Sequence, residues 1–599
     1  TGSYAGSQPS PSSPIRGQFS ADNTASATTL IIRNANVIPS IAAGQVIDFT
    51  NNGTGDGNVI YSSNAAQTVY TNSNPRIGVN NSTYDNLTFS GTGMKNVQGG
   101  KLSIGDSFDN SANSPSDFTT NKTEVTSYTN TINIPVSARI FNGGTTGTTF
   151  TDFIITINTA TGSANPNLNT TALGPTIITN RINIDTDGTV TLSGNSSLTA
   201  QTNATDIFTL KSGASSSATV MPIPSGSAIT GNVSVERFVK GSPTDLSKRG
   251  YRLISSPVFT GTVSGNRMQS YNYLLGSVYV SGLAGGGFNA GTSTNPTLYL
   301  YREDITPTGT TFTSSNYKGI AKINNTNTYD IGTQRRFTTT NMNDTTVNVP
   351  VGNGTLFFFR GDKSNNTTQT GTKLVSPFDY PEDVVLTAVG NLTQGTVDFR
   401  HWFNRPNMAT LSFTNSSAIN NNTSPRNVRG YNLVGNPYAS SIDWNKLNRN
   451  STATNSSVYA PNIDGAVWFF NPTNKQYESY IRPSGNPAND TIQTTNNGTL
   501  YAGTGSASNV IASGQGFFVR ANAAGGTLRF LESAKTIAQP AVASLNKVMG
   551  IPVSTVQGQF PYMRIQLKKD SLNDDDILIR FMEDGQEKYD AKEDAEDMG

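Results

Sequence analysis

Apolar pairs separated by one polar residue recur along the first third of the chain, with small polar residues between them. Leu87-Thr88-Phe89, Val190-Thr191-Leu192 and Phe208-Thr209-Leu210 are three of these triplets. Because side chains of a strand alternate between its two faces, both apolar residues of a triplet lie on the same face. The pattern predicts many short strands, each too short to be stable alone and therefore stacked on its neighbours.

Residues 84–89 and 150–155 share one longer pattern: an aromatic residue, a polar one, Asn or Asp, and then two apolar residues around a variable position. Echoes of this kind are typical of solenoids, in which coiled strands bury a narrow continuous core. We predict a right-handed parallel β-helix over residues 25–235, after an N-terminal arm at residues 1–24 that is rich in Ser, Gly and Pro. A run of antiparallel sandwiches would show the same alternation and stays open as the alternative.

The second half of the chain carries a clearer internal repeat, because four segments recur in the same order. Residues 249–257 match 429–437, 298–301 match 467–470, 353–360 match 513–520, and 395–399 match 526–530. The offset drifts from one match to the next, as expected when insertions lie in loops between fixed strands. We predict two homologous antiparallel β-sandwich domains, at residues 236–405 and 406–535, in a chain of the all-β class.

A linker is predicted at residues 536–556. Residues 557–599 are predicted to form the first part of a further β domain. That last part offers only two strands, at residues 563–567 and 577–581. Two strands alone are marginally stable. We therefore interpret this domain as partial, either truncated or completed by strands from elsewhere.

The composition narrows the chemistry that this fold can carry. The 599 residues include no cysteine, which excludes disulfides, thiolate zinc sites and cysteine nucleophiles, and one histidine, His401. A Ser-His-Asp triad is possible only there. No apolar run is long enough for a transmembrane helix, so the chain is not expected to span a membrane. Its start lacks the basic and apolar regions of an export signal, which we expect to have been removed or never present.

Charge is uneven although the formal net charge is only +1. The acidic residues concentrate in residues 570–599, and the basic residues elsewhere form no cluster. Nucleic acid is therefore not expected as a partner.

Several phrases of the second half occur together in a known class of proteins. They are residues 233–238 (VSVERF), 251–257 (YRLISSP), 431–438 (YNLVGNPY), 442–444 (IDW), 512–519 (ASGQGFFV), and the closing stretches 579–581 and 589–595. On these phrases the chain resembles secreted or cell-surface proteins of Bacteroidetes that the type IX secretion system exports. The resemblance implies a place outside a Gram-negative cell, in the medium or on the outer-membrane surface, with the secretion machinery as a partner during export.

Members of that family often place a β-helical region ahead of such modules and usually end in a C-terminal sorting domain. Nothing here resembles that domain, so the resemblance implies a chain that stops before it. It implies no enzymatic activity.

Carboxylates in the acidic tail are the candidates for metal binding. Asp574, Asp575, Asp576, Asp590 and Asp594 supply hard oxygen ligands of the kind that calcium prefers. A solvated acidic segment is the alternative interpretation. No other cofactor is predicted.

Three hydroxyl residues follow an aspartate and precede a small or apolar residue. Thr345, Thr491 and Ser571 therefore resemble the O-glycosylation signal of exported Bacteroidetes proteins.

Two other motifs are better explained by structure than by function. His401 lies among aromatic residues without a nucleophile elbow, which favours a structural histidine. Arg360-Gly361-Asp362 is the tripeptide that integrins bind, but the matching segment of the second repeat has Arg520-Ala521-Asn522.

Further candidates concern sugars. Arg181 with Asp185 and Asp187 resembles the basic and acidic residues of β-helical polysaccharide lyases, although Asp and Gly here also predict a simple turn. Aromatic residues are suited to stacking on sugar rings, and core packing would explain the same residues; the candidates are Tyr271, Tyr273, Trp402 and Tyr480.

No catalytic constellation is visible, so the chain is predicted not to be an enzyme. We expect an adhesin-like or structural extracellular protein that binds surface glycans or other surface proteins through an extended polar β surface. The alternatives are a β-helical lyase or hydrolase acting on polysaccharide, and a carbohydrate-binding protein.

Overall fold

The computed structural model has 43 strands and one short α-helix, α1 (Leu274–Ser277), among the residues that it describes. The all-β class is therefore confirmed. The described residues are 19–20, 28–33, 47–48, 57–69, 84–97, 100–109, 116–117, 123–127, 140–142, 148–156, 176–179, 181–193, 197–200, 207–289, 296–305, 316–323, 328–331, 345–363, 373–374, 376–403, 409–414, 428–472, 475–482, 502–503, 507–539, 562–568 and 574–580.

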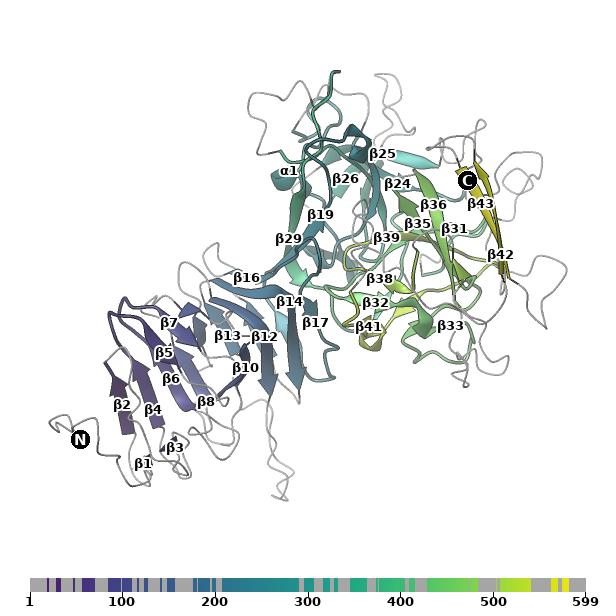
Figure 1. Cartoon of the computed structure of the whole chain (residues 1–599). Helices are drawn as coiled ribbons and strands as arrows, with labels where there is room; N and C mark the ends of the chain where they lie inside the picture. The colour runs from purple at the N-terminus through teal and green to yellow at the C-terminus, as the bar shows by residue number, and fades with distance from the viewer. Residues whose placement is uncertain are drawn as a thin grey trace. The chain divides into compact units, whose positions relative to one another are not determined.

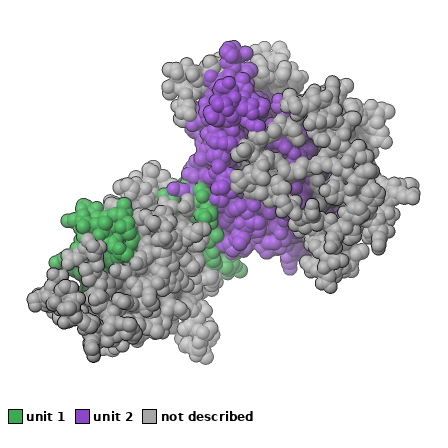
Figure 2. All heavy atoms as spheres, viewed as in Figure 1, with its two compact units in different colours: residues 1–210, 223–233 green, residues 211–222, 234–599 purple. Residues whose placement is uncertain are grey.

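The chain divides into two compact units, coloured separately in Figure 2. The first unit comprises residues 1–210 and 223–233, and the second comprises residues 211–222 and 234–599. Of the predicted arm and linker, only residues 19–20 and 536–539 are among those described.

The first unit is built on a long ladder of parallel strands that lie side by side in Figure 1. Parallel strands need a crossover between each pair, which the intervening loops supply. In order, the ladder is β2 (Thr28–Ile32), β4 (Gly57–Tyr61), β6 (Tyr84–Phe89), β8 (Gly100–Asp109), β10 (Thr123–Ser127), β12 (Thr148–Thr156), β14 (Arg181–Ser193) and β16 (Ile207–Leu210). Two shorter parallel ladders accompany it: β5 (Gln67–Val69), β7 (Lys95–Val97) and β9 (Ser116–Asp117), and β11 (Ile140–Asn142), β13 (Thr176–Thr179), β15 (Ser197–Ala200) and β18 (Ala228–Thr230).

The triplets define the buried face of this ladder. Leu87 and Phe89 are fully buried, whereas Thr88 between them is half-buried. The register places Val59 beside Leu87 and Tyr61 beside Phe89, so equivalent apolar side chains stack from one strand to the next. This column of apolar side chains supplies hydrophobic stabilisation that no single short strand could provide.

The two sequence repeats of the second unit form two antiparallel sheets with the same strand order. The first repeat (residues 249–399) gives the order β20 (Gly250–Ile254), β28 (Thr355–Phe359), β24 (Leu298–Tyr301), β25 (Tyr317–Ile323), β26 (Thr328–Ile331) and β27 (Thr345–Asn348). The second repeat (residues 429–530) gives β31 (Tyr431–Gly435), β39 (Gly516–Arg520), β35 (Ala466–Asn471), β36 (Gln476–Ile481) and β37 (Ala502–Gly503). The four matched segments thus supply corresponding strands.

Each sheet has its own apolar core. The core of the first repeat draws residues from its sheet and also from β19 (Val233–Val239) and β29 (Val384–Leu392). The core of the second repeat centres on Trp444 and Phe517 and adds Phe530 from β40 (Arg529–Phe530).

A third apolar cluster lies where the two repeats meet, and its members come in equivalent pairs. Leu253 of β20 has Leu433 of β31 as its counterpart, and Tyr299 has Trp468. Tyr317 lies opposite Tyr301, and Tyr477 lies opposite its counterpart Phe470, so the two tyrosines are equivalent. Their hydroxyl oxygens lie 3.0 Å apart. Equivalent residues that contact one another indicate an approximate two-fold relation between the repeats, as in an isologous dimer.

Backbone contacts between the repeats follow the same relation. Ile254 forms an antiparallel bridge with Gln515, and Val434 forms the equivalent bridge with Asn353. Strand β30 (Val397–Asp398) of the first repeat pairs with its own counterpart, β40, of the second. The duplicated segments therefore stabilise each other directly.

Strand register corrects one detail of the sequence alignment. Tyr251 lies opposite Phe358, whereas its counterpart Tyr431 lies opposite Arg520. The third matched segment is therefore shifted by two residues, so that Gly354 corresponds to Gly516 rather than Gly514. Packing explains the shift: a Cβ on Gly354 would lie 2.4 Å from the carbonyl oxygen of Val434 in the other repeat.

The C-terminal part forms one antiparallel hairpin, β42 (Tyr562–Lys568) and β43 (Asp574–Arg580). These are the two strands expected there, with β43 beginning three residues earlier than predicted.

Candidate functional site

The predicted calcium ligands fall partly on β43. Asp574, Asp575 and Asp576 lie in this strand, with the backbone of Asp574 opposite Lys568. Asp590 and Asp594 lie outside the described residues. Among the residues that the structure describes, no group of three or more His, Asp or Glu side chains is placed to hold a metal ion. Calcium binding by the tail stays a prediction.

Of the three predicted glycosylation residues, the structure describes one, Thr345. Thr345 is the first residue of β27, with its backbone opposite Ile331 of β26. Thr491 and Ser571 lie outside the described residues.

His401 lies in the protein interior with 4% of its surface exposed. Its ring centroid is 5.0 Å from that of Phe399 and 4.6 Å from that of Phe403. This packing between two aromatic rings supports the structural interpretation of the histidine.

The Arg360-Gly361-Asp362 tripeptide is held within the fold. Arg360 is 6% exposed, lies over the ring of Phe358, and donates from Nη1 to Thr297 Oγ1 at 2.7 Å. Burial lowers the pKa of its guanidinium to about 10. The backbone of Asp362 forms an antiparallel bridge with Val278. A buried arginine cannot present this tripeptide to a receptor.

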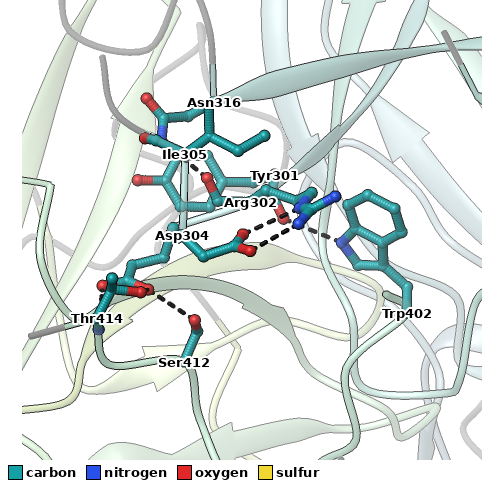
Figure 3. Close-up of polar contacts among 9 residues, drawn as sticks. Tyr301, Arg302, Asp304, Ile305, Asn316, Trp402, Ser412 and Thr414 are labelled. Carbon is teal, nitrogen blue, oxygen red and sulfur yellow. Dashed lines mark hydrogen bonds and ion pairs between the residues drawn. The ribbon is translucent and has the colours of Figure 1, made fainter. Parts of the chain in front are cut away.

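The aromatic residues considered for sugar stacking belong to the core or pack against it, which confirms the core-packing interpretation. Tyr271, Trp402 and Tyr480 are almost fully buried, and Tyr273 is half-buried. Burial raises the pKa of Tyr271 well above its ordinary value. Trp402 donates from Nε1 to the carbonyl of Tyr301 at 3.0 Å, which fixes its ring in place (Figure 3).

The stretch from Asp185 to Gly188 interrupts a ladder rather than ending a strand. Residues 181–193 are one strand, β14, yet Ile184 pairs with Phe150 and Thr189 already pairs with Asp152. The residues between them bulge out of the ladder. Sequence reasoning gave a turn here, and a bulge meets the same preference for Asp and Gly.

A buried carboxylate that sequence reasoning missed joins the repeats. Glu303 is 1% exposed, and its Oε1 accepts hydrogen bonds from the backbone N–H groups of Thr414 (2.8 Å) and Gly430 (3.0 Å). Its Oε2 accepts from the hydroxyls of Ser412 (2.6 Å) and Thr414 (2.7 Å). Figure 3 includes Ser412 and Thr414 together with the ion pair between Arg302 and Asp304, the residues on either side of Glu303 in the sequence. Four donors satisfy this carboxylate, so it serves as a structural link.

An exposed aromatic loop, residues 376–381, was also missed. Phe378 and Tyr380 are 38% and 45% exposed, and they are the aromatic residues among the large apolar side chains exposed in the described part of the chain. The guanidinium carbon of Arg249 lies 3.8 Å from the ring centroid of Phe378. The only sequence signal was the pair of prolines that frames Phe378-Asp379-Tyr380.

One small cavity of the second unit contains charged residues. It measures about 20 Å³ and is lined by Arg237, Glu236, Tyr273 and Ser513, among others. A cavity of that volume holds about one water molecule. Burial lowers the pKa of Arg237 to about 9, but the space is too small for an organic substrate.

Comparison with known protein families gives a match to part of the second unit. Residues 385–598 match the model of a domain of unknown function, DUF8693. No curated protein and no solved structure matches the chain. No described helix is both long and apolar enough to cross a membrane.

Proposed function

We propose that this protein is a non-catalytic, adhesin-like component of a Bacteroidetes cell surface, exported by the type IX secretion system. In this proposal the first unit is a right-handed β-helix and the repeats of the second unit are two β-sandwiches. The protein acts by holding binding surfaces away from the cell on a rigid scaffold.

The observation that carries the proposal is the use made of the buried polar groups. Glu303, Arg360 and His401 are the kinds of residue from which active sites are built, yet all three are engaged within the fold. Glu303 accepts hydrogen bonds from Ser412, Thr414 and Gly430 and so links the two repeats, and His401 packs between aromatic rings. Such groups stabilise one arrangement of the chain, which favours a scaffold over a catalyst.

The stacked strands of the first unit add support. Between β4 and β6, buried apolar side chains stack on one another, Val59 on Leu87 and Tyr61 on Phe89, as in a solenoid, where each coil is stabilised by its neighbours. A stiff spacer of this kind suits a protein that makes many weak contacts at once.

A polysaccharide-active enzyme remains the second candidate, favoured by the bulge in β14. Asp187 is exposed at this bulge, and Arg181 begins the same strand. Substitution Asp187→Asn would abolish glycan turnover if this candidate were correct, and would leave a binding protein unchanged.

Location is the first test of the proposed function. Surface proteolysis of intact cells of the native species, followed by immunoblotting, should remove the protein from wild-type cells. In a mutant without a functional type IX system, the protein should be protected inside the cell. Equal protection in both strains would contradict the proposal.

Calcium addition provides a separate test of the acidic tail. If the tail binds calcium, the melting temperature of the full chain should rise with calcium, and replacing Asp574, Asp575 and Asp576 by Asn should remove the rise. An unchanged melting temperature would refute the calcium prediction without affecting the proposed location.

A further inference from the structure

We propose that the aromatic loop at residues 376–381 is a binding platform for neutral saccharides, in which Phe378 and Tyr380 stack on the apolar faces of sugar rings. This inference rests on the proposed function and names the ligand class of one contact surface.

Exposure sets the two rings apart from the other aromatic residues of the second unit. Most of the Phe, Tyr and Trp side chains that the structure describes there belong to the three apolar clusters or pack against them, where their hydrophobic surface contributes to stability. Phe378 and Tyr380 instead keep over a third of their surface in water, two residues apart on one short loop. Exposed apolar surface held in a loop is characteristic of binding sites.

A buried lysine, Lys373, holds the backbone of the loop in place. Lys373 is 1% exposed, and its Nζ donates to the carbonyl of Tyr380 at 2.8 Å and to Glu382 Oε2 at 2.6 Å. The same Glu382 oxygen accepts from the backbone N–H of Asp362 at 3.1 Å. These bonds attach the C-terminal end of the platform to Lys373 and to the backbone of Asp362 in the first repeat. A platform fixed before binding loses little conformational entropy when a ligand arrives.

Phe378 packs against Arg249, which belongs to a series of cation–π contacts. Arg249 lies between Phe378, at 3.8 Å, and Phe358, at 5.3 Å. Arg360 lies over the ring of Phe358, at 4.7 Å. Arg249 also donates from Nη2 to the carbonyl of Lys373 at 2.6 Å. This series fixes the orientation of the Phe378 ring in the way that cation–π contacts order aromatic side chains.

The charges around the platform favour an uncharged ligand. Lys373 pairs with Glu382, and Lys240 pairs with Asp383 at 2.7 Å. The loop also carries the carboxylate of Asp379, whose charge the guanidinium of Arg249 against Phe378 offsets, so these six groups have no net charge. Two small rings are too little apolar surface for a stable protein interface, which buries roughly 800 Å² on each partner. A sugar offers a flat C–H face to each ring and hydroxyl groups to the polar residues beside it, such as Asp379 and the Tyr380 hydroxyl.

The test uses the full chain on an array of neutral oligosaccharides built from glucose, galactose, mannose and xylose, followed by calorimetric titration of the best binder. Phe378→Ala and Tyr380→Ala should each weaken binding about tenfold. Phe378→Leu, which keeps an apolar cover over Arg249, should weaken binding similarly while preserving the melting temperature. The matched control is Val389→Ala, because Val389 is 50% exposed on β29 of the same unit, and its affinity should stay within about twofold of wild type.

Three other outcomes would each contradict a different part of the proposal. If the wild-type chain binds a glycan and the ring variants bind it equally well, the platform is wrong while the contact function stands. If wild type binds phosphatidylcholine vesicles or a peptide library instead, and Phe378→Leu abolishes that binding, the saccharide assignment is wrong. If wild type binds none of the arrayed glycans, the platform proposal fails, whereas the location test of the proposed function is unaffected.

Discussion

Removing the carboxylate of Glu303 should weaken the link between the two repeats. Two substitutions, to Ala and to Gln, separate the loss of its hydrogen bonds from the loss of its charge. In Glu303→Ala, the backbone N–H groups of Thr414 and Gly430 lose their acceptor, along with the two hydroxyl donors of Ser412 and Thr414. A buried donor without an acceptor costs about 1–3 kcal/mol, so the two N–H groups alone should lower the free energy of unfolding by about 2–6 kcal/mol.

Glu303→Gln should cost much less because of how the donors are arranged. Both N–H groups donate to Oε1, and both hydroxyls donate to Oε2. A glutamine can keep its oxygen at the first position and donate from its NH₂ group to the hydroxyl oxygens at the second. Only the charge assistance is lost, which is worth about 1 kcal/mol.

Tryptophan fluorescence during urea unfolding measures this effect in the second unit alone. All three tryptophans, Trp402, Trp444 and Trp468, belong to that unit. Asp383→Asn is the matched control, since its ion pair with Lys240 is exposed and should contribute less than about 1 kcal/mol. Equal losses for Glu303→Ala and Glu303→Gln, or a loss below about 1 kcal/mol for Glu303→Ala, would refute the reasoning.

The same fluorescence assay checks three further expectations. Gly354→Ala should destabilise the second unit by more than about 2 kcal/mol, because the added Cβ would collide with the backbone of the other repeat. Gly276→Ala is the control and should be tolerated, since there is open space around Gly276. Equal losses of stability in the two variants would contradict the close approach of the repeats at Gly354. Tyr317→Phe should cost about 1 kcal/mol, and adding Tyr477→Phe should cost little more, since the two hydroxyls bond to each other; full additivity would show that they do not. Burial raises the pKa of Tyr329 from 10.0 to about 12, so its contribution to stability is present below pH 10 and is lost as the pH rises toward 12. The difference between wild type and Tyr329→Phe should therefore shrink by about 1.4 kcal/mol per pH unit in that window, and a constant difference would contradict the burial argument.

Local patterns were enough to predict the strands and the repeat. Alternation with period two places Leu87 and Phe89 on one face whatever the tertiary structure, and their burial follows. The matched phrases of the two repeats occupy corresponding strands because their apolar residues meet the same requirements in both sheets. Those parts of the fold depend on near neighbours in the sequence.

The details that depend on long-range contacts were not predictable in this way. The two-residue shift of Gly354 became visible only through its contact with the other repeat, because Gly514 and Gly516 both stand near the matching phenylalanines. Glu303 belongs to no motif, and its donors lie more than a hundred residues away. Such pairings are set by tertiary packing and leave little local signal.

The exposed aromatic loop at residues 376–381 was missed for a related reason. Tyr271 and Trp402 were candidates for sugar binding with core packing as the other explanation, and the fold buries both. Phe378 and Tyr380 look no different in sequence from these core residues. What distinguishes them is their surroundings in the fold, where the carbonyl of Tyr380 accepts a hydrogen bond from the buried Lys373, a contact that exists only in the folded chain.

Product formation on a bound glycan tests most directly whether this protein makes contacts rather than breaks bonds. The wild-type chain, held at saturating concentration with an oligosaccharide that it binds, should release no new reducing ends and no unsaturated products over a day. A steady rise in either, abolished by Asp187→Asn, would show that the β14 bulge is an active site and that the scaffold account is wrong.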